Sequence, residues 1–278
     1  MSRPGLPKLI ATDLDGTVVR PDGTVSDRTI AAFDRVAAAG IPIAGVTGRG
    51  PRLLDLSRQD LPQASYFVLG QGSQVIDVAN PDVPMHAVAM DGTLVLDVLA
   101  RLESTTGPLS VMVEPLNAPD NFLWGDRDPA WPYADSVHPY LRADALAVPV
   151  LKVFMRSAAL DVDDLLVAAR ALIEPEAVEF TQAGLGYVEI CPPGVTKGTG
   201  LAVVAEHLGV DPADILTFGD MPNDVPMFRY AGWRRVAVAG AHPELCTVAD
   251  EIIGDCTEDA VAIYLESLLD QEPQAHLS

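Results

Sequence analysis

The sequence predicts an α/β fold in which a doubly wound parallel sheet is interrupted by an inserted α+β domain. Strand-like apolar runs alternate with helix-like segments over residues 1–80 and again over residues 187–278. Such alternation is typical of a parallel sheet with helices on both faces. Residues 81–186 break the alternation and include a stretch rich in Pro, Asp and Trp. We therefore expect a discontinuous first domain, residues 1–80 and 187–278, and an inserted second domain, residues 81–186.

The first segment of the expected sheet contains three strands and two helices. Ser26 can cap a helix that runs through Ala39, and Gly40 can end it. Pro51 suits the first turn of the next helix, where the N–H that proline lacks would have no partner anyway. The expected strands are residues 8–12, 41–46 and 66–69.

The inserted segment carries strand and helix signals in irregular order. We expect strands at residues 85–90, 109–113, 148–155 and 178–181, and helices at residues 93–102 and 162–172. Residues 117–139 are rich in turn-forming residues and predict a loop with one short helix. This pattern indicates a compact α+β unit.

The last segment returns to the alternating pattern and completes the sheet. Apolar periodicity predicts helices at residues 199–208, 223–231 and 257–269, and strands at residues 214–218, 235–239 and 251–253. We expect the tail beyond Asp270 to be frayed. Since open parallel sheets bind ligands at the carboxyl ends of their strands, motifs that follow the strands are the candidates for a site.

The composition argues against several classes of protein. A formal charge of −21 over 278 residues disfavours a nucleic-acid partner or an anionic membrane. The three cysteines have no CxxC spacing, so we expect neither a zinc site nor a disulfide framework. No apolar run reaches membrane-spanning length, and the N-terminal residues do not resemble a signal peptide. We expect a cytoplasmic protein, either a monomer or a homodimer.

Asp13 and Asp15 directly follow the first apolar run. Side chains two residues apart in an extended chain point to the same side, so the two carboxylates can act together. Gly16 allows a sharp turn after them, and Thr17 adds a hydroxyl group nearby. A nucleophilic carboxylate beside an acid/base carboxylate is what phosphoryl transfer through an aspartyl-phosphate requires. An isolated motif of this kind is more often an ordinary acidic turn.

Two further segments carry groups that can bind phosphate. Thr47, Gly48 and Arg49 follow the second expected strand and offer a hydroxyl group, an open backbone and a cation. Lys197 precedes an expected helix and could place its ammonium group on a phosphate. Taken alone, the first segment would be a turn and the lysine a surface residue.

A second acidic segment follows the strand expected at residues 214–218. It contains Asp220, Asn223 and Asp224, so it offers two more carboxylates and an amide at the same edge of the sheet. The alternative interpretation of this segment is a simple helix cap.

These motifs, in this order, resemble those of the haloacid dehalogenase superfamily, and within it the Cof-like (type IIB) phosphatases. The resemblance covers DLDGT at 13–17, TGR at 47–49, Lys197 and GDMPND at 219–224. It implies that the first domain is a Rossmann-like catalytic core and that residues 81–186 form the family's type C2 cap. Four ordered motifs are far more specific than any one of them.

The resemblance also implies a mechanism. Asp13 would attack phosphorus and form an aspartyl-phosphate, while Asp15 would protonate the leaving group and later deprotonate water. Mg²⁺ would be held by the carboxylates of Asp13 and Asp220 and by the backbone carbonyl of Asp15. Asp224, together with Asn223, would orient the metal's water ligands. The residues implied in phosphate binding are Thr47, Gly48, Arg49, Lys197 and Asn223.

The expected activity is Mg²⁺-dependent hydrolysis of a small phosphoester, such as a sugar phosphate or a related metabolite. The alternatives are a phosphosugar mutase, a phosphoglycerate-type sugar-acid phosphatase such as mannosyl-3-phosphoglycerate phosphatase, and a ligand sensor without activity. The expected cap would select the leaving group, with Arg127, His138 and Arg142 as its polar candidates.

Two positions depart from the family pattern. The segment that contains Gln71 (Gly-Gln-Gly-Ser, residues 70–73) stands where relatives often show Asn-Gly, so a substrate or hinge contact there can differ. Pro222 stiffens the approach to Asn223. Neither departure removes a catalytic group.

Overall fold

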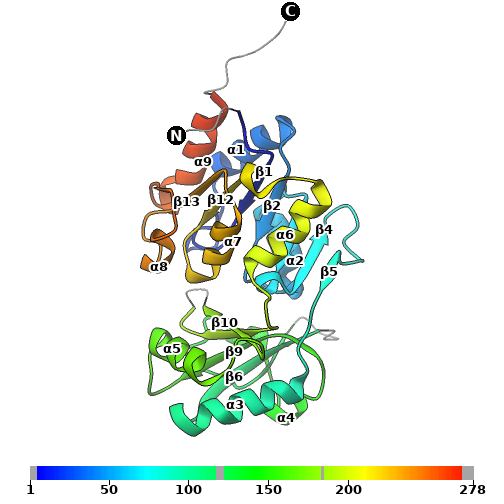
Figure 1. The fold of residues 1–278 in the computed structure, drawn as a ribbon, viewed down its shortest axis with the longest axis vertical. Helices are drawn as coiled ribbons and strands as arrows, with labels where there is room; N and C mark the ends of the chain where they lie inside the picture. The colour runs from blue at the N-terminus through cyan, green and yellow to red at the C-terminus, as the bar shows by residue number, and fades with distance from the viewer. Residues whose placement is uncertain (1–4, 117–121, 183–184, 271–278) are drawn as a thin grey trace, which may run out of the picture.

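Two β-sheets lie at opposite ends of the molecule, each with its own helices (Figure 1). The computed structural model describes residues 5–116, 122–182 and 185–270. The strand order is β14-β13-β12-β1-β2-β3-β4-β5 in the first sheet and β10-β11-β9-β6-β7-β8 in the second. We call the first sheet with its helices the core, and the second sheet with α3, α4 and α5 the cap. The predicted α/β class with a doubly wound core is confirmed.

The core sheet is parallel at its centre and antiparallel at one edge. Its parallel strands are β1 (Leu9–Thr12), β2 (Ile43–Val46), β3 (Tyr66–Leu69), β12 (Ile215–Gly219), β13 (Arg234–Ala237) and β14 (Glu251–Ile252). The antiparallel edge consists of β4 (Gln74–Asp77) and β5 (His86–Ala87). β1 pairs directly with both β2 and β12, so the ends of these three strands are neighbours.

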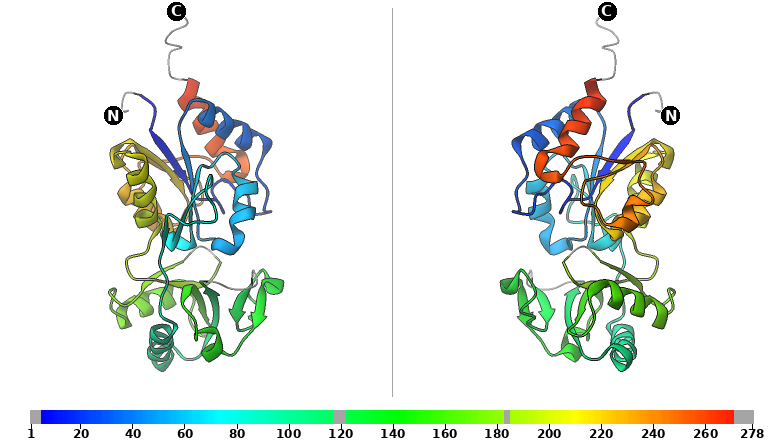
Figure 2. Two further views of the ribbon diagram at one scale, coloured as in Figure 1. Left: turned by 90° about the vertical axis from the view of Figure 1, so that its right-hand side faces the viewer. Right: turned by 90° about the vertical axis from the view of Figure 1, so that its left-hand side faces the viewer.

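Helices cover both faces of the core sheet, as Figure 2 shows. Ile10 packs on one face with Phe33 of α1, whereas its neighbours Leu9 and Ala11 pack on the other face with Leu201 of α6. Successive strand residues therefore serve opposite layers. The core helices are α1 (Asp27–Ala38), α2 (Leu54–Asp60), α6 (Lys197–Leu208), α7 (Val225–Tyr230), α8 (Pro243–Cys246) and α9 (Ala260–Asp270), with 3₁₀ turns at η1 (Pro51–Leu53), η2 (Gly70–Gly72), η4 (Pro212–Asp214), η5 (Pro222–Asp224) and η6 (Cys256–Glu258).

The cap sheet is mostly antiparallel and has helices on one face only. Its strands are β6 (Leu109–Pro115), β7 (Leu123–Gly125), β8 (Val137–Pro139), β9 (Val150–Ser157), β10 (Glu179–Gln182) and β11 (Val188–Cys191), and β7 and β8 pair in parallel. α3 (Gly92–Thr106) and α5 (Val162–Leu172) cover the face away from the core, and α4 (Arg142–Ala145) and η3 (Ala134–Ser136) lie between strands in the sequence (Figure 1). The uncovered face is turned toward the core.

Most of the predicted elements are present within two or three residues of their expected bounds. Ser26 caps α1 through the N–H of Thr29, and α5 has the bounds that its periodicity predicts. Residues 117–139 differ, because they contain β7 and β8 besides a short helix, and residues 117–121 of this expected loop lie outside the described residues. The tail beyond Asp270 also lies outside them.

Two short strands show which sheet the residues soon after positions 80 and 186 join. The strand expected at residues 85–90 is the two-residue β5, and it extends the core sheet through β4. β11, which the sequence analysis missed, pairs with β9 and β10 in the cap sheet. In both cases the reason is the same. A short strand belongs to the sheet that contains its hydrogen-bonding partners, which are β4 for β5 and both β9 and β10 for β11.

We expect Phe33→Ala to destabilise the core by about 3–5 kcal/mol, because it removes a fully buried ring between α1 and the sheet. Val83→Ala between β4 and β5 is the control, since that side chain is 71% exposed and its loss should change the free energy of unfolding by less than about 0.5 kcal/mol. Urea unfolding curves measure both. Equal effects of the two changes would contradict the packing described here.

Candidate active site

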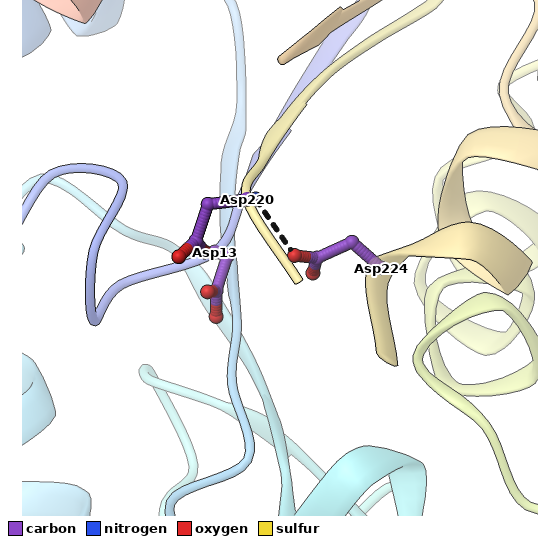
Figure 3. A group of neighbouring side chains, drawn as sticks. All are labelled: Asp13, Asp220 and Asp224. Carbon is purple, nitrogen blue, oxygen red and sulfur yellow. Dashed lines mark hydrogen bonds between the residues drawn. The ribbon is translucent and has the colours of Figure 1, made fainter. Parts of the chain in front are cut away.

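Two carboxylates meet at the carboxyl edge of the core sheet. Asp13 follows β1, and Asp220 follows the neighbouring strand β12. The backbone N–H of Asp13 donates to the carbonyl of Phe218 at 3.0 Å, which continues the pairing of β1 and β12 beyond the last strand residue of β1. The parallel pairing therefore places the two acids side by side, as Figure 3 shows.

A third carboxylate, that of Asp224, completes the cluster. Asp13, Asp220 and Asp224 each offer a carboxylate oxygen, and these oxygens lie within 4.8 Å of one another. Asp13 and Asp224 are buried, and Asp220 is partly buried. In Figure 3 the side chains of Asp13 and Asp224 approach from opposite sides of the strand that carries Asp220. Three acids this close need a compensating positive charge.

Lys197 supplies one positive charge from the first turn of α6. Its side chain is 0% exposed, and Nζ donates to Asp13 Oδ1 at 2.6 Å and to Asp224 Oδ1 at 2.7 Å. The expected helix at residues 199–208 begins two residues earlier, because Thr196 caps it through the N–H of Thr199. A Cβ at Gly198 would lie 2.5 Å from the carbonyl oxygen of Pro226, so only glycine lets α6 approach α7 this closely.

The loop after β12 is tightened by Asp224. Its Oδ2 accepts the backbone N–H groups of Asp220 and Met221, both at 3.0 Å. Pro222 occupies the first position of η5, where no N–H is required, so it is compatible with the turn. Gly219 fits against Asp224, because a Cβ there would lie 2.7 Å from its carboxyl carbon. Asp224 thus holds both the acidic loop and Lys197.

The turn after Asp13 fits closely against Asp220. Gly16 has φ +84°, and a Cβ on it would lie 2.4 Å from Asp220 Oδ2. Thr17 Oγ1 donates to Asp220 Oδ1 at 3.2 Å. The glycine is therefore required both for its backbone conformation and for the space that Asp220 occupies.

The acids of the cluster carry more negative charge than Lys197 offsets. Burial raises the pKa of Asp13, Lys197 opposes this shift, and Asp224 and Asp220 add to it. Burial and the charge of Asp224 raise the pKa of Asp220 to about 7. Burial lowers the pKa of Lys197, but Asp13 and Asp224 outweigh this effect and raise it above its ordinary value. One ammonium group among three acids leaves negative charge that a hard, oxygen-preferring cation such as Mg²⁺ can neutralise.

The side chain of Asp15 lies outside the carboxylate cluster. It is 57% exposed and pairs with Arg49, whose Nε and Nη2 donate to its two oxygens at 2.8 and 2.6 Å. Arg49 also pairs with Asp60 at 2.6 Å. Burial lowers the pKa of Arg49, but the two acids outweigh this and raise it. The structure therefore places Asp15 and Arg49 in contact with each other, next to the carboxylate cluster.

The remaining candidates for phosphate binding lie on loops next to the cluster. Thr47 is buried, and its Oγ1 accepts the N–H of Arg49 at 3.1 Å. Asn223 Nδ2 donates to Gln71 at 3.1 Å, whereas Asn223 Oδ1 is buried without a hydrogen-bond partner among the described residues. The carbonyl of Gly48 accepts a hydrogen bond from Lys152 of the cap at 2.5 Å.

A cavity of about 230 Å³ lies between core and cap, next to this cluster. Gln71, Lys197 and Asn223 contribute to its core side, and Arg170 and Thr181 to its cap side. The cavity is large enough for the non-reacting part of a small metabolite but not for a macromolecule.

Comparison with known proteins identifies the family. The family model for haloacid dehalogenase-like hydrolases matches residues 10–265. The chain belongs to this family. An HMP-PP phosphatase from Cronobacter sakazakii is 28% identical over 271 residues, which is 95% of this chain and 96% of that protein. An HMP-PP phosphatase from Enterobacter sp. is 27% identical over 270 residues, with the same coverage of 95% and 96%.

Solved structures show the same fold. A haloacid dehalogenase subclass IIB sugar phosphatase superposes with a TM-score of 0.78 at 18% identity, covering 94% of this chain and 98% of that one. A phosphatase of the superfamily from Bacteroides thetaiotaomicron superposes with a TM-score of 0.77 at 20% identity, covering 96% and 98%. The predicted family, and the predicted class of enzyme, a phosphoric monoester hydrolase of the haloacid dehalogenase type, are confirmed. Within the described residues, no helix is long and apolar enough to cross a membrane.

The sequence analysis named Arg127, His138 and Arg142 as cap residues that could contact the leaving group, and this stays a prediction. Arg142 pairs with Glu103 inside the cap, and His138 stacks on Phe122. Lys152, Glu189 and Glu114 of the cap contact the core. The sequence held one signal for Lys152 and Glu189, because each is a charged residue with apolar neighbours on both sides in its strand. It could not show which residues of the core they meet.

The raised pKa of Asp220 predicts that the metal-free hydrolase loses stability as the pH rises. The carboxyl group changes from an ordinary pKa of 3.8 to about 7 on folding. Between these values the folded state binds more protons than the unfolded state, so the free energy of unfolding falls with increasing pH. Thermal unfolding in EDTA should show this, and Asp220→Asn should flatten the profile between pH 4 and 7, roughly the interval between the two pKa values. Identical profiles for both proteins would contradict the assignment.

Proposed function

We propose that this hydrolase is a Mg²⁺-dependent phosphatase that cleaves a small phosphoester through an aspartyl-phosphate intermediate. The observation that carries the proposal is the group formed by Asp13, Lys197, Asp220 and Asp224, because it combines a buried nucleophile, a fixed cation and further oxygen donors. Few other reactions need three acids and one lysine at the end of a parallel strand.

Asp13 is the proposed nucleophile. Its carboxylate attacks phosphorus, the new bond joins Asp13 to phosphorus, and the bond from phosphorus to the leaving oxygen breaks. Lys197 lies 2.6 Å from Asp13 Oδ1 and favours the ionised form that can attack. In the second step, a water oxygen bonds to phosphorus and Asp13 is released.

Asp15 is the proposed acid and base. Its protonated form gives a proton to the leaving oxygen, and the resulting carboxylate takes a proton from the attacking water. The open position of its side chain supports this assignment, because the leaving oxygen and later the attacking water must both be able to reach it. Arg49 holds the carboxylate by two hydrogen bonds and so limits where it can lie.

The residues present fit a Mg²⁺ ion. The carboxylates of Asp13 and Asp220 and the backbone carbonyl of Asp15 would hold it, and the raised pKa of Asp220 is what neighbouring acids show without their cation. When bound, the ion supplies positive charge that offsets the charge on the phosphoryl oxygens. Asp224 supports this arrangement through the backbone of Asp220 and through Lys197, and with Asn223 we assign it to orienting the ion's water ligands.

The phosphoryl oxygens would be bound from two sides. Lys197 offers an ammonium group, and Thr47 offers its hydroxyl proton, since its oxygen already accepts the N–H of Arg49. The other assigned groups are Gly48, Arg49 and Asn223. Of these, Asn223 contributes to the wall of the cavity of about 230 Å³ between core and cap.

The substrate is proposed to be a small phosphorylated metabolite. The relatives named above are HMP-PP phosphatases, and a solved structure with the same fold is a sugar phosphatase. HMP-PP and a panel of sugar phosphates and phosphoglycerate-type sugar acids are therefore the compounds to assay. Formation of an isomeric sugar phosphate in place of inorganic phosphate would identify a mutase. A cytoplasmic location and a monomeric or homodimeric state stay predictions.

We expect Asp13→Asn to reduce phosphate release by at least roughly 1,000-fold, because an amide cannot form the phosphorylated intermediate. The fold should be retained, since the amide has the same shape. The matched control is Asp82→Asn, an exposed acid between β4 and β5, which should leave the rate unchanged. A colorimetric assay of inorganic phosphate, with circular dichroism for the fold, measures both. Near-normal turnover by Asp13→Asn would refute the assignment of Asp13 as the nucleophile.

Removal of Mg²⁺ should abolish activity and lower the melting temperature together. Excess EDTA is expected to reduce the rate by at least roughly 100-fold, and added Mg²⁺ should restore it, because the buried acids then lose and regain their counter-charge. Asp220→Asn should show a smaller shift in melting temperature on addition of Mg²⁺. Full activity in excess EDTA would be incompatible with the proposed metal site.

A further inference from the structure

Three charged side chains lie on the cap face that is turned toward the core. They are Glu114 on β6, Lys152 on β9 and Glu189 on β11, which are adjacent strands of the sheet. Each is at most 3% exposed. Their strand neighbours Val113, Val153 and Ile190 point the other way and pack beneath α3 and α5. Burying three charged groups at a boundary between domains is costly unless opposite charges and hydrogen bonds offset the loss of water.

Lys152 links the cap to the loop that follows β2. Its Nζ donates to the carbonyl of Gly48 at 2.5 Å and contacts Glu189 Oε1 at 3.2 Å. Gly48 lies between Thr47 and Arg49, so this hydrogen bond fixes the backbone of a loop proposed to bind phosphate. The ammonium group also lies 4.3 Å from the ring centroid of Phe154, which leaves it little freedom.

Glu189 links the cap to the acidic loop through Gln71. Its Oε2 accepts from Gln71 Nε2 at 2.5 Å, and Gln71 Oε1 accepts from Asn223 Nδ2 at 3.1 Å. Gln71 is buried and has φ +64°, a conformation that non-glycine residues rarely adopt. A strained backbone persists only where its surroundings hold it, and here two hydrogen bonds hold the side chain.

Glu114 adds a further contact between the cap and the core residues that follow β2. Its Oε1 lies 3.6 Å from Arg52 Nε, and its carboxylate occupies the space where a Cβ of residue 50 would be, so the glycine there is needed for the contact. The residues from Gly48 to Arg52 therefore meet two cap strands at once.

We propose that Lys152 and Glu189 form a latch that positions the two phosphate-binding loops only when the cap is closed. The inference rests on the proposed function. The hydrogen bonds to Gly48 and Gln71 cross from cap to core, so they must break when the cap opens to admit substrate. Opening releases the Gly48 backbone and frees the Gln71 amide that orients Asn223. Closure therefore restores the phosphate-binding geometry, which makes Lys152 and Glu189 positioning residues for the reaction.

The test is the double variant Lys152→Met/Glu189→Gln, which removes both charges and keeps the side-chain volumes. We expect kcat to fall at least roughly 10-fold, by the same factor for p-nitrophenyl phosphate and for the best metabolite substrate, with little change in KM. Equal losses are expected because the latch acts on the phosphate side of the site. A rise in KM confined to one substrate would show instead that these residues contact its leaving group, and would overturn the latch.

Small-angle X-ray scattering supplies a measurement that does not depend on turnover. The double variant should have a larger radius of gyration than the unmodified protein, because the closed state loses its hydrogen bonds across the boundary. The matched control is Gln182→Ala, which removes a buried glutamine bonded to Asp163 within the cap alone. It should change neither the radius nor kcat.

The two measurements also separate this inference from the proposed function. Equal radii for the variant and the unmodified protein would overturn the latch even if the enzyme is an active phosphatase. A chain without phosphatase activity but with an expanded double variant would refute the proposed function and leave the closure contact in place. Retained kcat in an expanded variant would refute the positioning role.

Discussion

The buried ammonium group of Lys197 is the contact on which the site depends. It lies between Asp13 and Asp224 with no exposed surface, and it joins α6 to the ends of β1 and β12. Without it, three neighbouring carboxylates in a dry environment would repel one another and take up protons. Glycines at positions 198 and 200 permit this contact, because larger residues would hold α6 away from α7 and from β3. The close packing of α6 therefore makes possible the ion pairs that Lys197 forms with the acids.

The parallel sheet determines which residues can meet around that lysine. β1 and β12 are neighbours in the sheet although they lie about two hundred residues apart in the chain, so their acidic ends form one surface. Asp224 then braces the loop through two backbone N–H groups, and Gly16 leaves room for Asp220. The site is rigid because each acid has a second structural contact. Such preorganisation suits the proposed phosphoryl transfer, in which positioning and charge supply most of the rate.

The cap contributes a second group of buried charged side chains, in addition to the group around Lys197. Its uncovered face carries acids and a lysine that contact the loops of the core, so this part of the boundary between the two domains is polar. A polar boundary can separate and re-form, because water can satisfy the same groups when the domains part. This property agrees with the proposed opening and closure of the cap.

Local patterns in the sequence determined the fold class, most strands and helices, and the acids at the strand ends, because periodicity and capping depend on neighbours in the chain. Asp13 and Asp220 could be expected to meet because parallel strands end at a common edge, whereas Lys197 and Asp224 joined the predicted site through the family resemblance. The tertiary structure decided the rest. The pairing of Asp15 with Arg49, the sheet that β5 and β11 join, and the contact of Lys152 with Gly48, 104 residues away, depend on segments that approach only after folding. No local pattern encodes which distant backbone group a buried charge will meet.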